Sequence, residues 1–282
     1  MSEVVDFEMV RLVGMHRHDQ PGYYSLKDLP QRPSVAHIAQ TTGWWELDQI
    51  WKLYHGQFTV VTGVAGHGKS TFLLNVMVNQ AKQIGTRWFL YAPENEQHLR
   101  DKLERIWGPE PGFKLFCEHQ CYVQTAPPPR YDTAAKTIDW VLDKAIVAIE
   151  RDNVDVVMID PWNELERAKP KDQLLSDYIG QCLMYLKQFC RSESVSVIVV
   201  AHPTKAGVSD GKVPGLADIE GSMNWFNKCD NGLIVVRDLN ASTSEVISAK
   251  CREEGAGKRG RCHFFVDEAS GRFTPQHGAV TP

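Results

Sequence analysis

The sequence lacks any apolar run that approaches the roughly 20 residues needed to span a bilayer. Its first residues also lack the basic start and apolar core of a secretory signal peptide, and they do not resemble a transit peptide. The seven cysteines follow no regular spacing, as is usual for reduced thiols. We therefore predict a cytoplasmic protein with no membrane partner, and a location inside an organelle is less favoured.

An excess of positive charge is also missing, because the net charge is -4 at pH 7. This excludes a protein coated in basic residues, although a local basic strip is enough to bind nucleic acid. The C-terminal third is locally richer in lysine and arginine. A zinc site is disfavoured: Cys117, His119 and Cys121 lie close together, but a fourth ligand at a suitable spacing is missing.

The sequence shows neither an internal repeat nor a second hydrophobic core. Hydrophobic residues make up 43% of the chain, which is enough for one sizeable core. We predict one folded domain over residues 42–275. Residues 1–41 have few periodic apolar positions and are expected to form an arm or linker, with one short strand at residues 9–13. Residues 276–282 are expected to be a frayed tail.

The central feature that the sequence does contain is the stretch Gly63–Thr71, which reads GVAGHGKST. It matches G-x-x-x-x-G-K-[ST], with a β-branched run before it and an apolar helical pattern after it. A chance match is disfavoured because both flanks also fit. Such a turn directs backbone N–H groups toward a phosphate, and side chains in place of the glycines would block them.

The motif predicts that Lys69 binds the β- and γ-phosphates of a nucleotide and that the Ser70 hydroxyl binds Mg²⁺. The nucleotide is ATP or another NTP or dNTP. The nucleotide-binding residues predicted from this stretch are Gly63, Gly66, Gly68, Lys69, Ser70 and Thr71.

Buried strand patterns alternate with helical patterns along most of the chain. Short apolar, β-branched runs are followed by segments with apolar residues at helical spacing, which predicts parallel strands joined by helices. Three further strands then follow one another closely, which predicts antiparallel pairing. The fold class is therefore α/β, a mostly parallel central sheet flanked by helices with an antiparallel C-terminal edge. The predicted strands are 58–62, 87–92, 121–125, 154–160, 195–201, 232–237, 245–250 and 262–266.

Polar residues stand at the ends of three predicted strands, where active groups of parallel sheets gather. Asp160 is expected to hold Mg²⁺ as part of the nucleotide site. Glu94 is the predicted general base, with Glu96 as the alternative; either glutamate is also explained as a helix start stabilised by the helix dipole. His202 is either a sensor of the γ-phosphate or a hydrogen-bonded core histidine.

Lys250 and Arg252 alternate on one predicted strand, so their side chains point the same way. Two cations that project together suit an arginine finger reaching into a neighbour's active site. A solvated edge strand, on which lysine commonly prevents aggregation, explains the pattern equally well.

Taken together, the motifs resemble the RecA-type motor domain of ring-forming replicative helicases, in the phage primase-helicase and mitochondrial Twinkle branch of the DnaB-like superfamily. The resemblance extends from about Thr42 to Pro275, and the order and spacing of its motifs match together. The segments that carry it are Gly63–Thr71, Pro93–Asn95, Ile159–Glu164, Ala201–Lys205, Asp218–Ser222 with Asn224–Lys228, and Lys250–Arg252.

The resemblance implies a role for each matching residue. Glu94 is similar to the catalytic glutamate, Asp160 to the Mg²⁺-linked aspartate and His202 to the γ-phosphate sensor. Lys250 and Arg252 resemble the piston lysine and arginine finger that act in trans. The stretch 205–218 resembles the channel loop that grips single-stranded DNA, so the implied DNA-binding residues are Lys205, Lys212 and Gly215.

The expected protein is an ATP-driven DNA helicase motor of phage or bacterial replication that forms a hexameric ring. The departure from the family lies in residues 1–41, which match neither a primase domain nor a long linker helix. Three explanations stay open: the sequence is a fragment, the primase is encoded separately, or the protein does not prime DNA synthesis. A separate primase or polymerase is an expected partner under the second of them. The alternatives are a RecA-like recombinase or filament-forming ATPase that does not unwind DNA, and a nucleotide-gated module that binds a protein partner.

Overall fold

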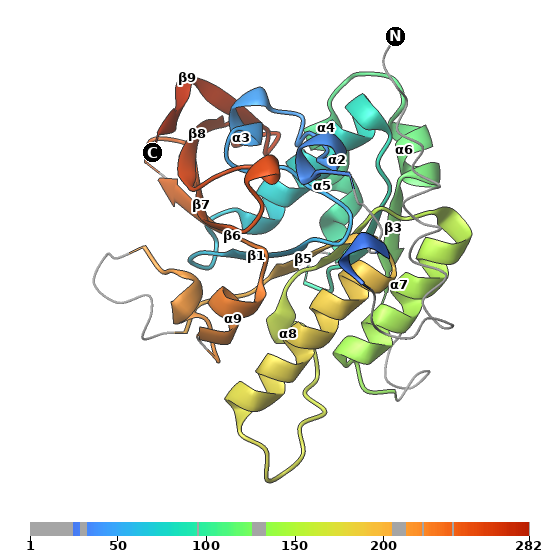
Figure 1. The fold of residues 1–282 in the computed structure, drawn as a ribbon. Coiled ribbons are helices and arrows are strands. Elements are labelled where there is room, and N and C mark those ends of the chain that lie inside the picture. The colour runs from blue at the N-terminus through green and yellow to red at the C-terminus, as the bar shows by residue number, and fades with distance from the viewer. Residues whose placement is uncertain are drawn as a thin grey trace.

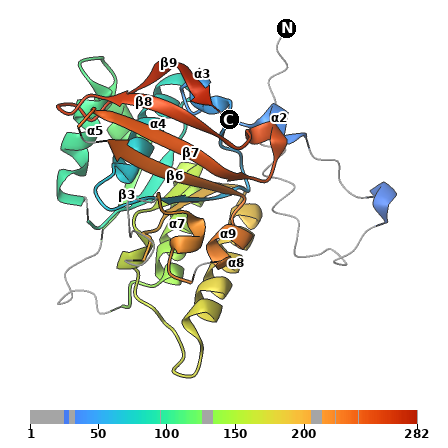
Figure 2. The same cartoon turned by 90° about the vertical axis from the view of Figure 1, so that its left-hand side faces the viewer.

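A nine-stranded sheet forms the centre of the described residues, with strand order β3-β2-β4-β5-β1-β6-β7-β8-β9 (Figures 1 and 2). The computed structural model describes residues 25–28, 33–94, 96–125, 134–204, 213–221, 223–238 and 240–281. The strands are β1 (Phe58–Thr62), β2 (Trp88–Tyr91), β3 (Cys121–Gln124), β4 (Val156–Ile159), β5 (Ser196–Val200), β6 (Asn231–Asp238), β7 (Thr243–Cys251), β8 (Gly260–Val266) and β9 (Phe273–Thr281).

The sheet changes from parallel to antiparallel at β6. All neighbours from β3 to β6 pair in parallel, and β6 to β9 pair antiparallel. Strands β1, β2, β4 and β5 are buried throughout, as expected for strands covered on both faces. Buried and more accessible residues alternate along β7 and β8. The predicted α/β fold with an antiparallel C-terminal edge is therefore confirmed.

Helices cover both faces of the parallel part (Figure 2). One face carries α4, α5 and α6, and the other carries α7, α8 and α9. The remaining α-helices of the described residues are α2 and α3. Short 3-10 helices also occur, among them η3 (Glu96–His98). Helix bounds are α2 (Val35–Ile38), α3 (Trp45–Asp48), α4 (Lys69–Ile84), α5 (Leu99–Trp107), α6 (Phe113–His119), α7 (Ile138–Asp152), α8 (Leu175–Ser192) and α9 (Met223–Lys228).

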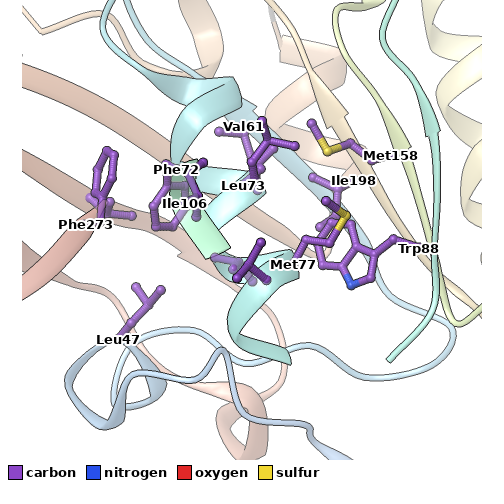
Figure 3. Packing of buried hydrophobic residues seen from close by; sticks show 14 of the residues in the cluster. Leu47, Val61, Phe72, Leu73, Met77, Trp88, Ile106, Met158, Ile198 and Phe273 are labelled. Carbon is purple, nitrogen blue, oxygen red and sulfur yellow. The ribbon is translucent and has the colours of Figure 1, made fainter. Parts of the chain in front are cut away.

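Helix α4 packs on one face of the parallel strands β1, β2, β4 and β5. Its apolar side chains Phe72, Leu73 and Met77 are fully buried and pack with strand residues such as Val61 and Ile198 (Figure 3). The helix ends where Gly85 adopts φ 72° and donates its N–H to the Gln80 carbonyl at 3.1 Å, the usual geometry of a glycine C-cap. This packing fixes the start of α4, which carries Lys69 and Ser70.

The prediction of a frayed tail is wrong, because residues 276–281 belong to β9. Val280 and Thr281 pair with β8, and Phe273 at the start of β9 packs against the rings of Phe72 and Phe264, at 5.9 and 5.7 Å between ring centroids. Pro275 suggested disorder, but β9 is the outer strand, where proline removes no ladder hydrogen bond that the sheet needs. The strand predicted at residues 9–13 lies outside the described residues.

The end of the predicted arm contacts the domain. Gln40 forms a β-bridge with Leu53, and a side chain at Gly255 would come within 2.4 Å of the Ala36 nitrogen. The domain boundary at residue 42 stays a prediction. Within the described part of the chain, none of the helices has both the length and the apolar character that a membrane crossing requires.

Candidate active site

Four parallel strands bring the predicted site residues to one edge of the sheet. In the order β2-β4-β5-β1, each strand ends just before a polar group or the glycine loop. Glu94 follows β2, Asp160 follows β4, His202 follows β5, and Gly63 follows β1. Because these strands are neighbours and run the same way, residues separated by up to 139 positions meet at this edge.

The glycine loop closes around the amino group of Lys69. Gly63, Gly66 and Gly68 adopt positive φ angles of 141°, 79° and 81°. Lys69, whose side chain is buried, donates from Nζ to the carbonyl oxygens of Gly63 at 2.9 Å and Val64 at 3.0 Å. The loop and the first turn of α4 form a backbone cradle of the kind that receives phosphate.

Gly63→Ala is expected to destabilise the domain by about 3 kcal/mol, because the new Cβ would lie 2.2 Å from the Val235 carbonyl oxygen, at a φ that L-residues rarely adopt. Gly66→Ala is the matched control, since a Cβ there meets nothing within 4 Å. It should cost only about 1 kcal/mol of backbone strain. Urea unfolding of both variants measures the difference, and equal losses would contradict close packing of the loop on β6.

Asp160 is the buried acid of the site. Burial raises the pKa of its carboxyl to about 6, against the opposing effects of a hydrogen bond from Ser70 and the charge of Lys69. Its Oδ2 is buried and accepts no hydrogen bond from any residue that the structure describes. A buried carboxylate oxygen with a lone pair to spare, next to a serine hydroxyl, is the donor set that Mg²⁺ prefers.

Lys69 and Glu94 complete the charge pattern around Asp160. Burial lowers the pKa of Lys69 to about 8, and the charges of Asp160 and Glu94 oppose that shift. Glu94 is exposed in the turn after β2. Glu96 lies in the following short helix and acts instead on the Tyr91 hydroxyl, whose pKa burial mainly raises. The electrostatic contacts therefore favour Glu94 over Glu96 as the carboxylate of this group.

The residues at this edge fit a Mg²⁺-nucleotide. The glycines form a cradle that side chains would obstruct, Lys69 supplies a buried cation for phosphate oxygens, and Ser70 and Asp160 supply oxygen ligands.

His202 links this edge to the segment that follows β5. Its backbone N–H donates to the Asn163 side chain at 3.2 Å, and its buried Nδ1 has no partner among the described residues. Burial and the charge of Lys69 lower the pKa of the ring, which keeps it neutral at pH 7. A neutral histidine beside a phosphate cradle is able to donate or accept one hydrogen bond.

The segment after His202 is tied at both ends. Pro203 bridges Ile219, and the Thr204 N–H donates to the Asp218 carbonyl at 2.8 Å. Gly215 donates its N–H to the Asp218 carboxylate at 2.7 Å. These contacts hold the base of the predicted DNA loop close to His202. Lys205 and Lys212 lie outside the described residues.

One contact at the site, between His67 and Arg237, was not predicted from the sequence. The Arg237 N–H at the end of β6 donates to Nδ1 of His67 at 3.2 Å, which places the ring proton of neutral His67 on Nε2. Burial and the nearby charges of Lys69 and Arg237 lower the pKa of His67. Since His67 and Arg237 are 170 positions apart in sequence, only the sheet order reveals this pairing.

Lys250 and Arg252 lie at the other end of the strands from the glycine loop, where the parallel strands begin. Cys251 pairs with Asn231 at the start of β6, whereas Gly63 abuts Val235. At about 3.3 Å per residue, Asn231 and Val235 are separated by roughly 13 Å along the strand.

Both cations contact the end of α9. Lys250 Nζ donates to the Phe226 carbonyl at 2.5 Å and lies 5.1 Å from the centroid of the Phe226 ring, while Arg252 approaches the Asn227 carbonyl at 3.5 Å. Burial lowers the pKa of Lys250. The structure therefore brings Lys250 and Arg252 together but keeps them apart from the glycine loop of their own chain.

Comparison with known proteins gives consistent matches. A family model described as an AAA domain matches residues 45–208, more than half of the chain. The chain is 32% identical over 298 aligned positions to the Twinkle homolog protein, chloroplastic/mitochondrial, of Arabidopsis thaliana. The match covers 93% of the chain but 40% of that relative's length.

Two solved structures share the fold. A structure described as an ATPase domain matches 98% of the chain and 100% of its own length, with a TM-score of 0.68 and 17% identity. A DnaB-like replicative helicase, described together with its interactions with primase, matches 83% of the chain and 62% of its own length, with a TM-score of 0.68 and 18% identity. The RecA-like fold expected from the resemblance is thereby confirmed.

Proposed function

The chain belongs to the AAA domain family, and from this premise we propose that it is the ATP-hydrolysing motor of a replicative DNA helicase. The observation that carries the proposal is the position of Arg252. It stands half-exposed at the edge opposite its own glycine loop, where an arginine finger is available to another copy of the chain. The named relative and the matched helicase support a motor that acts on DNA.

Hydrolysis follows from the arrangement of the site. The loop amides and Lys69 would bind the phosphates, and Ser70 and Asp160 would hold Mg²⁺, which would supply positive charge to neutralise the phosphate oxygens. Glu94 accepts the proton of the attacking water, and Arg252 of the neighbouring subunit stabilises the charge that develops on the transferred phosphoryl group.

Coupling to DNA uses the short path from His202 to the 203–221 segment. Nδ1 of His202 is poised for a hydrogen bond that depends on the γ-phosphate, and the next residue is bridged to Ile219. A shift of His202 after hydrolysis would move the base of the loop that carries Lys205, Lys212 and Gly215. A hexameric ring would place six such loops around single-stranded DNA.

The proposed partners are single-stranded DNA, further copies of the chain, and a separate primase or polymerase. The proposed compartment is the cytoplasm of a bacterial or phage-infected cell. The seven free cysteines suit a reducing compartment. The Arabidopsis relative is named as chloroplastic/mitochondrial. Import into one of these organelles is therefore the alternative, and cell fractionation tests it.

Two measurements test the proposed function. ATP hydrolysis should rise with single-stranded DNA, and electron microscopy with nucleotide and DNA should show closed rings. Open helical filaments would instead favour a recombinase-like ATPase. Hydrolysis that does not respond to DNA would favour a nucleotide-gated module that binds a protein.

Lys212→Ala is expected to weaken binding of single-stranded DNA at every sequence while sparing hydrolysis without DNA. One phosphate contact fewer should reduce the slope of log K against log salt by about 0.7. Fluorescence anisotropy across a salt series measures the slope. Lys171→Ala, which removes an exposed lysine from the loop before α8, is the charge-matched control. Unchanged affinity of the Lys212 variant across the series would refute the loop assignment.

A further inference from the structure

Arg252 is held by a buried carboxylate that the active-site residues do not include. Its Nε lies 3.2 Å from Oδ1 of Asp230, and its backbone N–H donates to the Asp230 carbonyl at 3.0 Å. The Asp230 side chain is 2% exposed, whereas that of Arg252 is 42% exposed. One end of this ion pair is therefore fixed inside the domain, and the other end faces outward.

Asp230 directly precedes β6 and is hydrogen-bonded to the first residue of β1. Its Oδ2 accepts the Phe58 N–H at 3.1 Å, and its own N–H donates to the Phe58 carbonyl at 2.8 Å. Lys187 of α8 donates to Oδ1 at 2.7 Å, so the carboxylate receives two cations and one backbone N–H. A buried carboxylate held by these three donors has little freedom to move.

We propose that Asp230 is a positioning residue that aims Arg252 at the active site of the neighbouring subunit. The proposal rests on the trans-acting role of Arg252 proposed above. A guanidinium is planar, and Nε lies at its inner end, so fixing Nε also fixes the direction of the two terminal nitrogens. Those terminal N–H groups are the pair that binds phosphate oxygens.

Lys187 and Arg252 have different roles at Asp230: Lys187 balances the charge of the buried carboxylate, and Arg252 extends from it toward the neighbouring subunit. Lys187 supplies a second positive charge to Asp230, so the carboxylate does not depend on Arg252 for compensation. Arg252 is therefore able to keep Nε at Asp230 while its terminal nitrogens meet a phosphate. One of them, Nη2, would exchange the Asn227 carbonyl, 3.5 Å away, for a phosphate oxygen. Asp230 also joins the first residue of β1, the strand that leads to the subunit's own glycine loop, to the finger that serves the next subunit.

Asp230→Asn tests the proposal, because it keeps the shape and the acceptor for Phe58 but removes the charge that holds Nε. The expected result is a roughly 10- to 100-fold loss of DNA-stimulated hydrolysis, in line with the cost of misplacing a reacting group by about 1 Å. Nucleotide affinity, measured with a fluorescent ATP analogue, should stay within twofold because the glycine loop is untouched.

Mixing subunits separates positioning from general stability. Asp230→Asn subunits keep an intact glycine loop, and Lys69→Ala subunits keep an intact Asp230–Arg252 pair. A mixture should therefore regain activity at shared sites, although each variant alone is impaired. An inactive Asp230→Asn protein that Lys69→Ala subunits do not restore would assign Asp230 to the fold alone and overturn the proposal.

Further variants keep the outcomes distinct. If Arg252→Ala is fully active, the proposed function is wrong. If Arg252→Ala is inactive but Asp230→Asn is fully active, only the role proposed for Asp230 is wrong. Glu245→Gln, which breaks the Glu245–Arg261 ion pair on the same sheet, is the matched control and should retain activity. If Asp230→Asn does not fold, Arg252→Lys tests the proposal instead. The ammonium of the new lysine should remain at Asp230, so this variant should lose as much hydrolysis as Arg252→Ala. Retention of more than a tenth of wild-type hydrolysis would overturn the proposal.

Discussion

Arg252→Ala is expected to lower DNA-stimulated ATP hydrolysis by about 10³-fold or more, the usual contribution of an arginine finger. The loss falls on turnover because the finger meets charge that appears only as the phosphoryl group is transferred. ATP binding should be nearly unchanged, since Arg252 lies roughly 13 Å along the sheet from the loop that binds the phosphates in its own subunit. Steady-state hydrolysis and nucleotide titration measure the two quantities separately.

Arg261→Ala is the control for this variant. Arg261 is another arginine of the antiparallel edge, partly exposed and paired with Glu245 at 3.1 Å. Removing an exposed ion pair of this kind changes little, so hydrolysis should remain within twofold of wild type. Full activity of a protein made only of Arg252→Ala subunits would contradict a site shared between copies of the chain.

Asp160→Asn is expected to reduce hydrolysis by about 10²- to 10³-fold, the usual cost of removing one group that stabilises transition-state charge. It should also remove a pH dependence that the wild-type protein shows. Burial raises the pKa of the Asp160 carboxyl to about 6 in the nucleotide-free protein, so this group is charged above pH 6 and neutral below it. Protons therefore compete with Mg²⁺, and Mg²⁺-dependent nucleotide binding should weaken as the pH falls through 6.

Calorimetric titration of a slowly hydrolysed ATP analogue with Mg²⁺ between pH 5 and 8 measures this effect. Asp155→Asn is the control, because Asp155 precedes β4 whereas Asp160 follows it, and Asp155 instead accepts the Arg87 N–H at 2.9 Å. The Asp155 variant should keep the wild-type pH dependence. A wild-type affinity that is constant through pH 6, or an Asp160→Asn protein that weakens there as much as the wild type, would contradict the assignment of Asp160 as the Mg²⁺ ligand.

The local parts of the site were predictable from the sequence because they depend on short-range patterns. The glycine motif identifies Gly63–Thr71, and the rule that parallel strands share a carboxyl edge is enough to bring Asp160, Glu94 and His202 together. The same rule places Lys250 and Arg252 at the far edge once β7 is known to run antiparallel to β6.

The contacts that sequence patterns did not predict join distant segments. Asp230 receives its donors from Phe58, Lys187 and Arg252, which belong to three different parts of the chain. No spacing rule connects such residues. Strand β9 was missed for a local reason, since Pro275 and Gly278 are typical of loops, and the Phe273 contacts that hold the strand come from α4 and β8.

The proposed motor function requires ATP hydrolysis at sites shared between subunits to drive strand separation. Its most direct test is displacement of a labelled strand from a forked duplex with ATP, comparing wild type, Lys69→Ala, Arg252→Ala, and a mixture of the two variants. Separation by the wild type, none by either variant alone, and partial recovery of ATP hydrolysis in the mixture are the predicted results. Strand separation by Arg252→Ala alone would show that the sites are not shared between subunits. DNA-stimulated hydrolysis by the wild type without any separation would show that the chain is not a helicase motor.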